Sequence, residues 1–474
     1  MESTDRPVRV SSLDGRGFLG ELPIDVPLLP GDFVLIEPPE RERLLGQVLD
    51  RRLDGRSSSV SGALRAAVAP DETVGPISPR PFADATLGLP PPPVVNRFQR
   101  WAGADLRIGT TLSGHGVEAP ALVRRKGFNR HTFVCGQSGS GKTYALGVLL
   151  EQLIAHTELP MIIVDPNADF VRLGHVRVGA DPQQAQQLGS PDVRALRASP
   201  DGPPAIGEQL AVSFAQMRSA AKAAALRVDP IADRDEYNDL LHILDESAGQ
   251  QEMAAFVEQL DNQGDEVARA VVKRVQNLGI LNWDIWARGR TSLLDLAETH
   301  PRCLVLDVSG CHVPQERTVA TLALLDHLWG RREERRPVLV VVDEAHNLCT
   351  PDPVDALQAA VTDRLVQIAA EGRKYGLWLM LSTQQPRKIH PNVLSQCDNL
   401  VLMRMNSTAD LATLGDVFGA APPQMLSTAT AFRQGELLLT GGFVAAPMIA
   451  RVAERLTEEG GSDVAVPLGP PPPE

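Results

Sequence analysis

The stretch that decides the fold is Gly136-Gln137-Ser138-Gly139-Ser140-Gly141-Lys142-Thr143. It fits the phosphate-binding pattern G-x-x-x-x-G-K-[ST] at every fixed position. The glycines let the backbone curl so that successive N–H groups point at a β-phosphate, with no Cβ in the way. In such a loop Lys142 reaches the β- and γ-phosphates, and the Thr143 hydroxyl takes a place on Mg²⁺. The predicted nucleotide contacts are Gly136, Ser138, Gly139, Ser140, Gly141, Lys142, Thr143 and Tyr144.

The flanks of this loop agree with the motif. Residues 131–135 form a short apolar run that predicts a buried strand, and residues 144–154 carry apolar side chains at helical spacing. The phosphates would therefore lie at the N-terminus of a helix, where backbone N–H groups are free to bind them. A chance match is the alternative, and the order strand, loop, helix argues against it.

Composition narrows the class of protein. The chain has 474 residues, enough for two or three domains, and 43% of them are apolar. No apolar run approaches the roughly 20 residues that span a bilayer, so we expect a cytoplasmic protein without a membrane partner. The formal net charge of −13 argues against a generally basic nucleic-acid coat but leaves open DNA binding in one localised channel.

The five cysteines are scattered along the chain without metal-ligand spacing. Three of them lie in or beside predicted strands. We therefore expect reduced, buried thiols rather than a disulfide framework.

Domain boundaries follow changes in composition. Residues 1–69 alternate short apolar runs with turn signals and predict a small β-barrel. Residues 70–104 are proline-rich and predict a stiff linker and lead-in. Residues 105–455 would form the nucleotide-binding domain, with a helical insertion at about 205–285, and residues 456–474 a disordered proline-rich tail.

Five further apolar runs and a closing pair predict the rest of the central sheet. They are continuous rather than alternating and are separated by helical patterns, which is typical of a parallel sheet covered on both faces in an α/β protein. Residues 183–204, polar and containing Pro and Gly, are expected to be a loop. The predicted strands are residues 160–165, 303–307, 338–343, 377–382 and 400–403, with a closing pair at 436–439 and 448–452.

Asp343-Glu344 ends one of these strands. Asp343 would hold Mg²⁺ through its water shell, and Glu344 would polarise the attacking water. A strand that ends in two acids is a weak signal alone, but paired with a complete phosphate-binding loop it is strong. The adjacent Glu favours a motor-type ATPase over a kinase, whose nucleophile is its substrate.

Two groups of polar residues follow the next strand. Gln384, within Ser382-Thr383-Gln384-Gln385-Pro386, is a sensor candidate because a side-chain amide there can hydrogen-bond the γ-phosphate or the lytic water. The alternative is an ordinary turn before proline. Arg387, Lys388 and His390 would contact phosphates if they faced a ring pore, or would simply be solvated.

Arginines are candidates for an arginine finger. Arg373, in Glu371-Gly372-Arg373-Lys374-Tyr375-Gly376, could reach a neighbouring subunit's γ-phosphate, a contact that contributes about 10³–10⁵ in rate. Supplying it in trans requires a ring. Arg130, just before the phosphate-loop strand, and Arg404, after the strand at 400–403, are further candidates, and a solvated surface arginine is the alternative for each.

In their order along the chain these motifs resemble the HerA/FtsK superfamily of hexameric DNA-pumping ATPases, and its HerA branch in particular. The resemblance covers roughly residues 105–455. It rests on Asn129-Arg130-His131, Asp165-Pro166-Asn167, Asp343-Glu344-Ala345-His346-Asn347, residues 371–376, residues 382–386, and Pro391-Asn392-Val393-Leu394-Ser395-Gln396-Cys397.

The resemblance implies a RecA-like P-loop NTPase core, a homo-hexameric ring, ATP and Mg²⁺ bound at subunit interfaces, and double-stranded DNA in the central pore. It adds Asp165, Arg130 and Arg404 to the nucleotide contacts, and implies a nuclease or other effector partner, in DNA end processing or antiviral defence. The N-terminal strands resemble the barrel shared by HerA-type proteins and ring ATP synthase subunits. Two departures stand out: Gln385 replaces a common arginine, and a Pro351–Pro353 turn lengthens the segment before Arg373.

The sequence therefore predicts an ATP-dependent DNA translocase or helicase with Lys142, Glu344, Gln384 and Arg373 as its catalytic residues. The alternative is an ATP-gated ring scaffold that activates a bound effector without moving DNA. A coupling ATPase of conjugation or secretion is disfavoured, because such proteins usually carry membrane segments.

Overall fold

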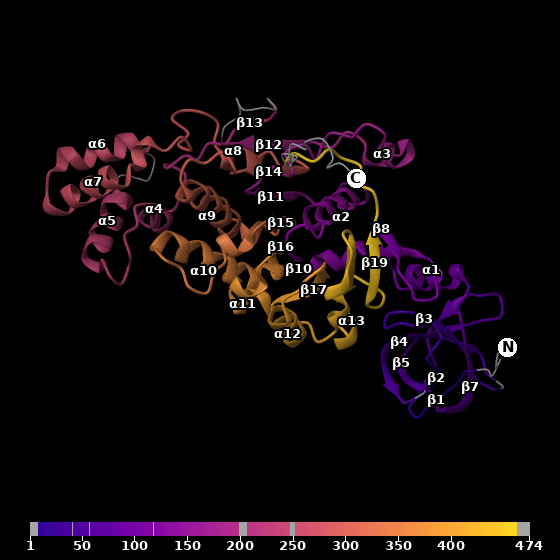
Figure 1. Ribbon diagram of the computed structural model, residues 1–474. Coiled ribbons are helices and arrows are strands. Elements are labelled where there is room, and N and C mark those ends of the chain that lie inside the picture. Colours follow the sequence, from indigo (N-terminus) through magenta and orange to yellow (C-terminus); the bar gives the residue numbers. More distant parts are fainter. Residues whose placement is uncertain are drawn as a thin grey trace, which may run out of the picture.

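The computed structural model describes residues 8–39, 41–55, 57–116, 118–198, 206–246 and 252–461. A β-barrel lies at one end of the molecule, an α/β body in the middle and a group of helices at the other end (Figure 1). Of the tail expected at 456–474, residues 462–474 lie outside the described residues, whereas residues 456–461 pack against the α/β body.

The N-terminal barrel is closed by six strands. The antiparallel order is β2-β1-β7-β3-β4-β5, and pairing of β2 with β5 closes the ring. Their inward side chains form a separate apolar core. The strands are β1 (Arg9–Ser12), β2 (Gly17–Pro23), β3 (Phe33–Glu37), β4 (Arg43–Asp54), β5 (Ser57–Val68) and β7 (Phe82–Gly88), with β6 (Val74–Gly75) added beside β5.

The region expected as a linker, residues 70–104, is instead largely ordered secondary structure. It contains β7, which pairs with both β1 and β3, and helix α1 (Pro92–Trp101). The prolines flank these elements rather than spacing two domains. The helix begins at Pro92, where a proline loses no intrahelical hydrogen bond.

A sheet of twelve strands forms the α/β body, in the order β13-β12-β14-β11-β15-β16-β10-β17-β18-β19-β8-β9. Neighbours from β13 to β17 run parallel, and those from β17 to β9 run antiparallel. The strands are β8 (Leu106–Thr111), β9 (Pro120–Val123), β10 (His131–Cys135), β11 (Met161–Asp165), β12 (Val193–Arg197), β13 (Glu208–Gln209), β14 (Cys303–Asp307), β15 (Val338–Val342), β16 (Leu377–Thr383), β17 (Cys397–Leu402), β18 (Glu436–Thr440) and β19 (Met448–Val452).

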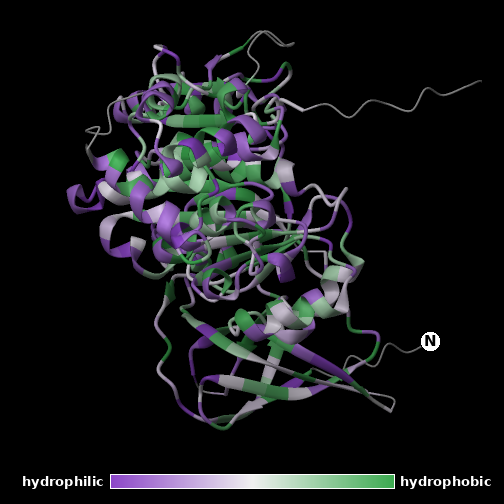
Figure 2. Cartoon of the chain, turned by 90° about the vertical axis from the view of Figure 1, so that its left-hand side faces the viewer, coloured by the Kyte–Doolittle hydropathy of each residue, from purple (hydrophilic) through white to green (hydrophobic). Residues whose placement is uncertain are grey.

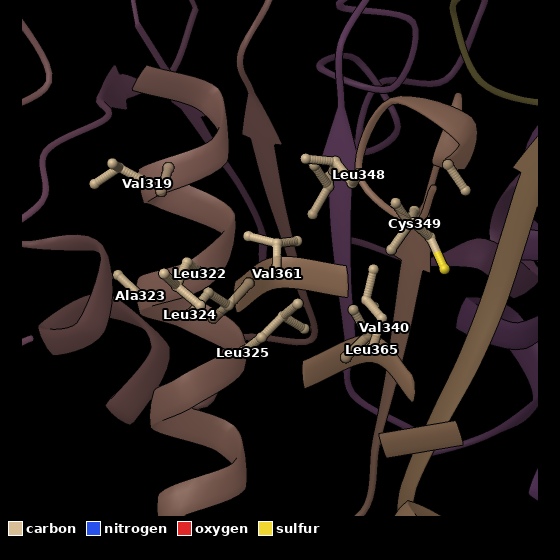
Figure 3. Packing of buried hydrophobic residues seen from close by; sticks show 14 of the residues in the cluster. Val319, Leu322, Ala323, Leu324, Leu325, Val340, Leu348, Cys349, Val361 and Leu365 are labelled. Carbon is tan, nitrogen blue, oxygen red and sulfur yellow. The ribbon is translucent and has the colours of Figure 1, made fainter. Parts of the chain in front are cut away.

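Helices cover both faces of the parallel strands, so the predicted α/β class with a mainly parallel sheet is confirmed. Along β10, Phe133 and Cys135 face one core while Val134 faces the other. Helix α2 (Lys142–His156) covers the second face, and α9 (Pro314–Gly330) and α10 (Ala356–Glu371) cover the first. Figure 3 shows side chains of α9 and α10 gathered with Val340 of β15, and in Figure 2 the hydrophobic residues concentrate on the inner strands.

The stretch expected as a loop at 183–204 contains a helix and a buried strand. Helix α3 spans Pro182–Leu188, and β12 (Val193–Arg197) lies parallel to β14. The two arginines in this strand, Arg194 and Arg197, obscured it in the sequence. Arg197 is buried because its Nε donates to Asp307 Oδ2 at 2.8 Å, and a charge paired in this way can lie inside a protein.

Residues 219–246 and 252–278 contain a group of four helices beyond α9. Their inward residues, such as Phe256 of α6 and Val271 of α7, join the core that covers the first face of the sheet. The helices are α4 (Ser219–Ala225), α5 (Arg234–Glu246), α6 (Met253–Gln263) and α7 (Glu266–Leu278); the remaining α-helices are α8 (Leu293–Glu298), α11 (Pro391–Leu394), α12 (Thr408–Val417) and α13 (Pro423–Ser427).

Hydrogen bonds hold the barrel against the antiparallel end of the sheet. Gln47 Nε2 of β4 donates to the Pro447 carbonyl at 2.6 Å, and the Gln424 side chain of α13 bonds both the N–H and the carbonyl of Arg51. These bonds join residues nearly 400 positions apart and fix the barrel beside the strand pair β18–β19.

The segment after β19 is held by a buried carboxylate of α2. Glu151 accepts hydrogen bonds from the N–H groups of Leu456 and Thr457 and from the Thr457 hydroxyl, and its Oε1 lies 3.8 Å from Arg455 Nε. Gly147 leaves room for the guanidinium, because an added Cβ there would lie 2.6 Å from Arg455 Nε. The last described residues are thereby fixed to the helix that begins the nucleotide site.

Replacing Glu151 by Ala should lower the free energy of unfolding by about 3–5 kcal/mol, because it removes the buried counter-charge of Arg455 and leaves that guanidinium only its longer contact with the more exposed Glu459. Chemical denaturation of the full chain measures this change. The matched control is Glu158→Ala, at an exposed position just after α2, which should change stability by less than about 0.5 kcal/mol. Equal effects of the two substitutions would contradict the structural role of Glu151.

Candidate nucleotide site

The phosphate-binding loop connects β10 to α2, as the motif predicts. Gly139 and Gly141 have φ values of +71° and +91°, which L side chains rarely adopt. At Gly136 an added Cβ would lie 2.7 Å from Ser140 Oγ and 2.8 Å from Met403 Cβ. The loop therefore requires glycine at these positions, and it ends at the N-terminus of a fifteen-residue helix.

The Lys142 ammonium lies among three oxygen atoms from neighbouring strand ends. Its Nζ donates to Asp343 Oδ1 at 2.9 Å, to Glu344 Oε1 at 3.1 Å and to Ser382 Oγ at 2.9 Å. Burial opposes the charge of this group, but the two carboxylates outweigh it and raise the pKa of Lys142 above its ordinary value. The lysine is thus a fixed cation at the carboxyl edge of the sheet.

Asp343 and Glu344 follow β15 at the same edge. Asp343 is 1% exposed, and its Oδ2 has no hydrogen-bond partner. Buried polar atoms are nearly always hydrogen-bonded, so this oxygen is free to bind an ion or a water molecule. Glu344 has a φ of +44°, a left-handed conformation that is strained for a glutamate and typical of functional sites.

These residues fit a magnesium ion that is held mainly by phosphates and water. The orphaned Asp343 Oδ2 offers a carboxylate oxygen, and Thr143, the second residue of α2, supplies a hydroxyl. Among the described residues no cluster of three or more His, Cys, Asp or Glu side chains has the geometry of a metal site. Mg²⁺ keeps several waters and takes few protein ligands, so this set suits it.

The end of β16 brings Gln384 to the Glu344 carboxylate. Gln384 Nε2 donates to Glu344 Oε1 at 2.9 Å. His346 Nδ1 lies 3.0 Å from Thr383 Oγ1 and 3.3 Å from Glu344 Oε2. Burial lowers the pKa of His346, although the charge of Glu344 opposes this effect. Oε1 of Glu344 is thus held by Lys142 and by the predicted sensor Gln384, whereas Oε2 has no hydrogen-bond partner.

Sequence reasoning gave no role to His346 or Ser382. Each has a signal in retrospect: His346 stands two residues after Glu344, and Ser382 is a hydroxyl placed directly after five apolar strand residues. Ser382 is fully buried, and its hydroxyl accepts a hydrogen bond from Lys142.

Asp165 and Tyr144 do not point toward the lysine. The Asp165 carboxylate accepts hydrogen bonds from the N–H groups of residues 167, 169 and 170, and burial raises the pKa of Asp165 to about 7. The Tyr144 hydroxyl accepts from the Arg455 N–H at 2.6 Å. Both side chains therefore shape the surroundings of the loop rather than lining the phosphate position.

Asp169 was not predicted from the sequence as a site residue, yet it lies close enough to Asp343 and Lys142 for their charges to shift its pKa. Burial, and then the negative charge of Asp343, raise the pKa of Asp169 to about 6, while Lys142 opposes the shift. Its backbone N–H donates to Asp165, so the turn that Asp165 organises places Asp169. Nothing in the local sequence distinguishes this aspartate from other loop acids.

The three candidate arginines lie at two different edges of the sheet. Arg404 follows β17, and its Nη2 donates to the Gly139 carbonyl at 3.4 Å, so it belongs to the carboxyl edge with the phosphate-binding loop. Arg130 precedes β10 and Arg373 precedes β16, which places them at the amino edge. A five-residue strand is about 16 Å long, so neither Arg130 nor Arg373 reaches the loop of its own chain.

The basic residues after Gln384 are on the surface. Arg387 and Lys388 are exposed, as is Gln385. The His390 ring accepts a hydrogen bond from the Asn392 N–H at 3.2 Å and caps α11. Arg387 and Lys388 are therefore available to a partner, whereas His390 has a local structural contact.

The described cysteines are free thiols, four of them buried and Cys311 half-buried. Burial raises the pKa of Cys303 to about 12, which makes its thiolate scarce at neutral pH. Among the described residues, the helices are too short or too polar to cross a bilayer.

Comparison with known sequences identifies similar proteins. Residues 106–324 match the family described as "Helicase HerA, central domain". The "DNA double-strand break repair helicase HerA" of Sulfurisphaera tokodaii is 32% identical over 127 residues, which is 27% of this chain and 25% of that protein. The "Probable DNA double-strand break repair helicase HerA" of Methanocaldococcus jannaschii is 28% identical over 131 residues, 28% of this chain and 25% of that protein. The matched region is about a quarter of each relative's length.

Solved structures share the fold. VirB4 of Thermoanaerobacter pseudethanolicus superposes with a TM-score of 0.53 at 15% identity, covering 74% of this chain and 96% of that chain. The bacterial conjugative coupling protein TrwBΔN70 superposes with a TM-score of 0.51 at 15% identity, covering 78% and 93%. At this identity the likeness concerns the fold alone.

Replacing Lys142 by Ala should lower ATP turnover at least about 100-fold, because the cation that would stabilise the developing phosphate charge is removed. Steady-state phosphate release measures this, and circular dichroism checks that the fold remains. The control Lys126→Ala changes an exposed lysine and should leave turnover unchanged. Unaltered turnover in the Lys142 variant would show that the site is elsewhere.

Proposed function

We propose that this chain, which is similar to HerA-type helicases and shares the fold of P-loop ATPases, hydrolyses Mg²⁺-ATP and uses the free energy to move double-stranded DNA through a ring of identical subunits. The observation that carries the proposal is the convergence of Lys142, Asp343, Glu344 and Gln384 at one edge of the sheet. Each has a role that ATP hydrolysis needs, and they come from three separate strand ends.

The chemistry follows from these contacts. The glycine-rich loop and Lys142 bind the phosphates, and Glu344 orients the attacking water and accepts its proton. Glu344 Oε1 is shared by Lys142 and Gln384, so movement of Lys142 onto phosphate oxygens would leave Gln384 to orient the carboxylate. Thr143 and, through water, Asp343 would hold Mg²⁺, which would supply positive charge to the phosphates.

One protomer supplies only part of this site. Arg373 lies at the amino edge, about one strand length from its own phosphate-binding loop. We propose that it reaches the γ-phosphate bound to the next subunit, with Arg130 beside it and Arg404 acting within its own subunit. A contact of one edge with the opposite edge of the next copy is heterologous and closes into a ring when its rotation allows; we propose six subunits.

The DNA proposal rests on the relatives and on one surface feature. The matched relatives are named DNA double-strand break repair helicases. Arg387 and Lys388 are exposed immediately after the sensor strand, where a change at Gln384 would move them. We propose that they contact DNA phosphates in the pore, that a nuclease or other effector works with the ring in DNA processing or antiviral defence, and that the protein acts in the cytoplasm.

A second function is an ATP-gated scaffold that activates a bound effector without moving DNA. The net charge of −13 favours it, because the chain has 59 acidic and 46 basic residues and so repels a polyanion overall. This scaffold would use the same catalytic residues. Its nucleotide cycle would activate the effector instead of moving DNA.

Mixing two inactive variants tests action in trans. Arg373→Ala and Glu344→Gln should each lower turnover at least 100-fold alone. In rings mixed at equal amounts, about a quarter of interfaces pair an intact base with an intact arginine, so turnover should return to about a quarter of the wild-type value. The control Arg100→Ala, at an exposed residue of α1, should behave as wild type. Absence of recovery would place Arg373 outside the neighbour's site.

The salt dependence of DNA stimulation separates the two functions. A translocase that holds duplex phosphates should show DNA-stimulated turnover whose apparent DNA affinity falls steeply with salt, because bound counterions are released. Arg387→Ala with Lys388→Ala should reduce the slope of log affinity against log salt by about 2. Turnover indifferent to DNA at every salt concentration would favour the scaffold.

A further inference from the structure

Three charged side chains meet at the amino edge of the sheet. Arg373 Nη1 donates to Asp398 Oδ2 at 2.8 Å, and Arg130 Nε lies 3.6 Å from the same oxygen. Arg373 lies in the turn η5 (Gly372–Tyr375) before β16, Arg130 precedes β10, and Asp398 is the second residue of β17. The strand order β16-β10-β17 brings these three distant segments together.

Hydrogen bonds of His131 hold together the backbone segments that carry this cluster. His131, next to Arg130, accepts a hydrogen bond at Nδ1 from the Leu379 N–H at 2.9 Å, and its Nε2 donates to the Ala369 carbonyl at 3.0 Å. Burial, together with the charges of Arg373 and Arg130, lowers the pKa of His131 to about 4, so the ring stays neutral and keeps both bonds. The last turn of α10, which leads directly into the turn carrying Arg373, is thereby fixed to β10.

Exposure of the three side chains argues against a role in stability. The side chains of Arg373, Arg130 and Asp398 are 35%, 47% and 45% exposed. Ion pairs at such positions contribute little to the free energy of folding, because water screens them. Two guanidinium groups brought side by side also repel each other, and one carboxylate between them offsets that repulsion.

We propose that Asp398 is a positioning residue that holds Arg373 and Arg130 together as one two-cation unit for the triphosphate bound to the neighbouring copy of the chain. The inference rests on the proposed action of Arg373 in trans. Two guanidinium groups suit phosphate oxygens, because each can donate two parallel hydrogen bonds to them. Asp398 orients Arg373 by a direct hydrogen bond, whereas Arg130 lies 3.6 Å from the same oxygen and also donates to Asn129.

The experiment compares Asp398→Ala and Asp398→Asn in the full-length protein, with kcat and the KM for ATP measured separately. Asp398→Ala should lower kcat by about 10²-fold, the effect of misplacing a catalytic group by about 1 Å. The KM for ATP should change less than about 3-fold, because the subunit's own phosphate-binding loop is intact. Asp398→Asn should keep most of the activity, since its carbonyl still accepts from Arg373.

Three controls distinguish positioning from a structural role. Asp363→Ala removes an exposed carboxylate of α10 and should leave kcat and KM unchanged. Asp398→Ala should keep the particle mass and thermal unfolding midpoint of the wild type. Asp398→Ala protein mixed with Glu344→Gln protein should recover turnover, because the Glu344→Gln subunits still have the intact Arg373, Arg130 and Asp398 cluster. If Asp398→Ala instead damaged the nucleotide site of its own subunit, mixing would not restore turnover.

The outcomes separate this inference from the proposed function. Wild-type kcat in Asp398→Ala, alongside an inactive Arg373→Ala, would overturn the role of Asp398 and leave the trans arginine standing. Loss of assembly or folding in Asp398→Ala would overturn it also, in favour of a structural role. Lack of turnover in the wild-type protein would overturn the proposed function itself.

Discussion

The contact on which the site depends is the Lys142 ammonium between the carboxylates of Asp343 and Glu344. It joins the helix after β10 to the end of β15, two elements separated by β16 in the sheet. The hydroxyl of Ser382, in that intervening strand, is the third group that accepts a hydrogen bond from Lys142. Because a buried cation needs counter-charges, these three strand ends must stay in register, and the same register places Gln384 against Glu344.

A second consequence of the sheet is the separation of the two arginine positions. The strands that carry Lys142 and Gln384 at their carboxyl ends carry Arg130 and Arg373 before their amino ends. Helix α10 runs from near the Asp343-Glu344 turn to the turn that bears Arg373. In a ring, helix α10 would therefore connect the nucleotide site of its own subunit with the arginine that contacts the neighbouring subunit's nucleotide. Such a connection is a physical route by which successive subunits could act in order.

The sequence predicted the features that depend on local patterns. The glycine-rich loop, the acids after β15 and the apolar runs of the parallel sheet are each specified by neighbouring residues. Contacts between distant segments could not be predicted from the sequence. Strand β7 lies between prolines, and β12 contains an arginine whose charge is paired with Asp307. Nothing in the sequence around Asp398 indicates that it binds Arg373. Side-chain direction was equally out of reach, since Asp165 and Tyr144 stand beside the motif but bond to backbone elsewhere.

The central claim is that each hydrolytic site is assembled from two copies of the chain, and dilution tests it most directly. Particle mass and ATP turnover per protomer would be measured on the same samples across a dilution series, with ATP binding followed in parallel. The account predicts that turnover per protomer falls with the assembled fraction, while isolated protomers still bind ATP through Lys142 and its loop. Full turnover by isolated protomers would contradict it.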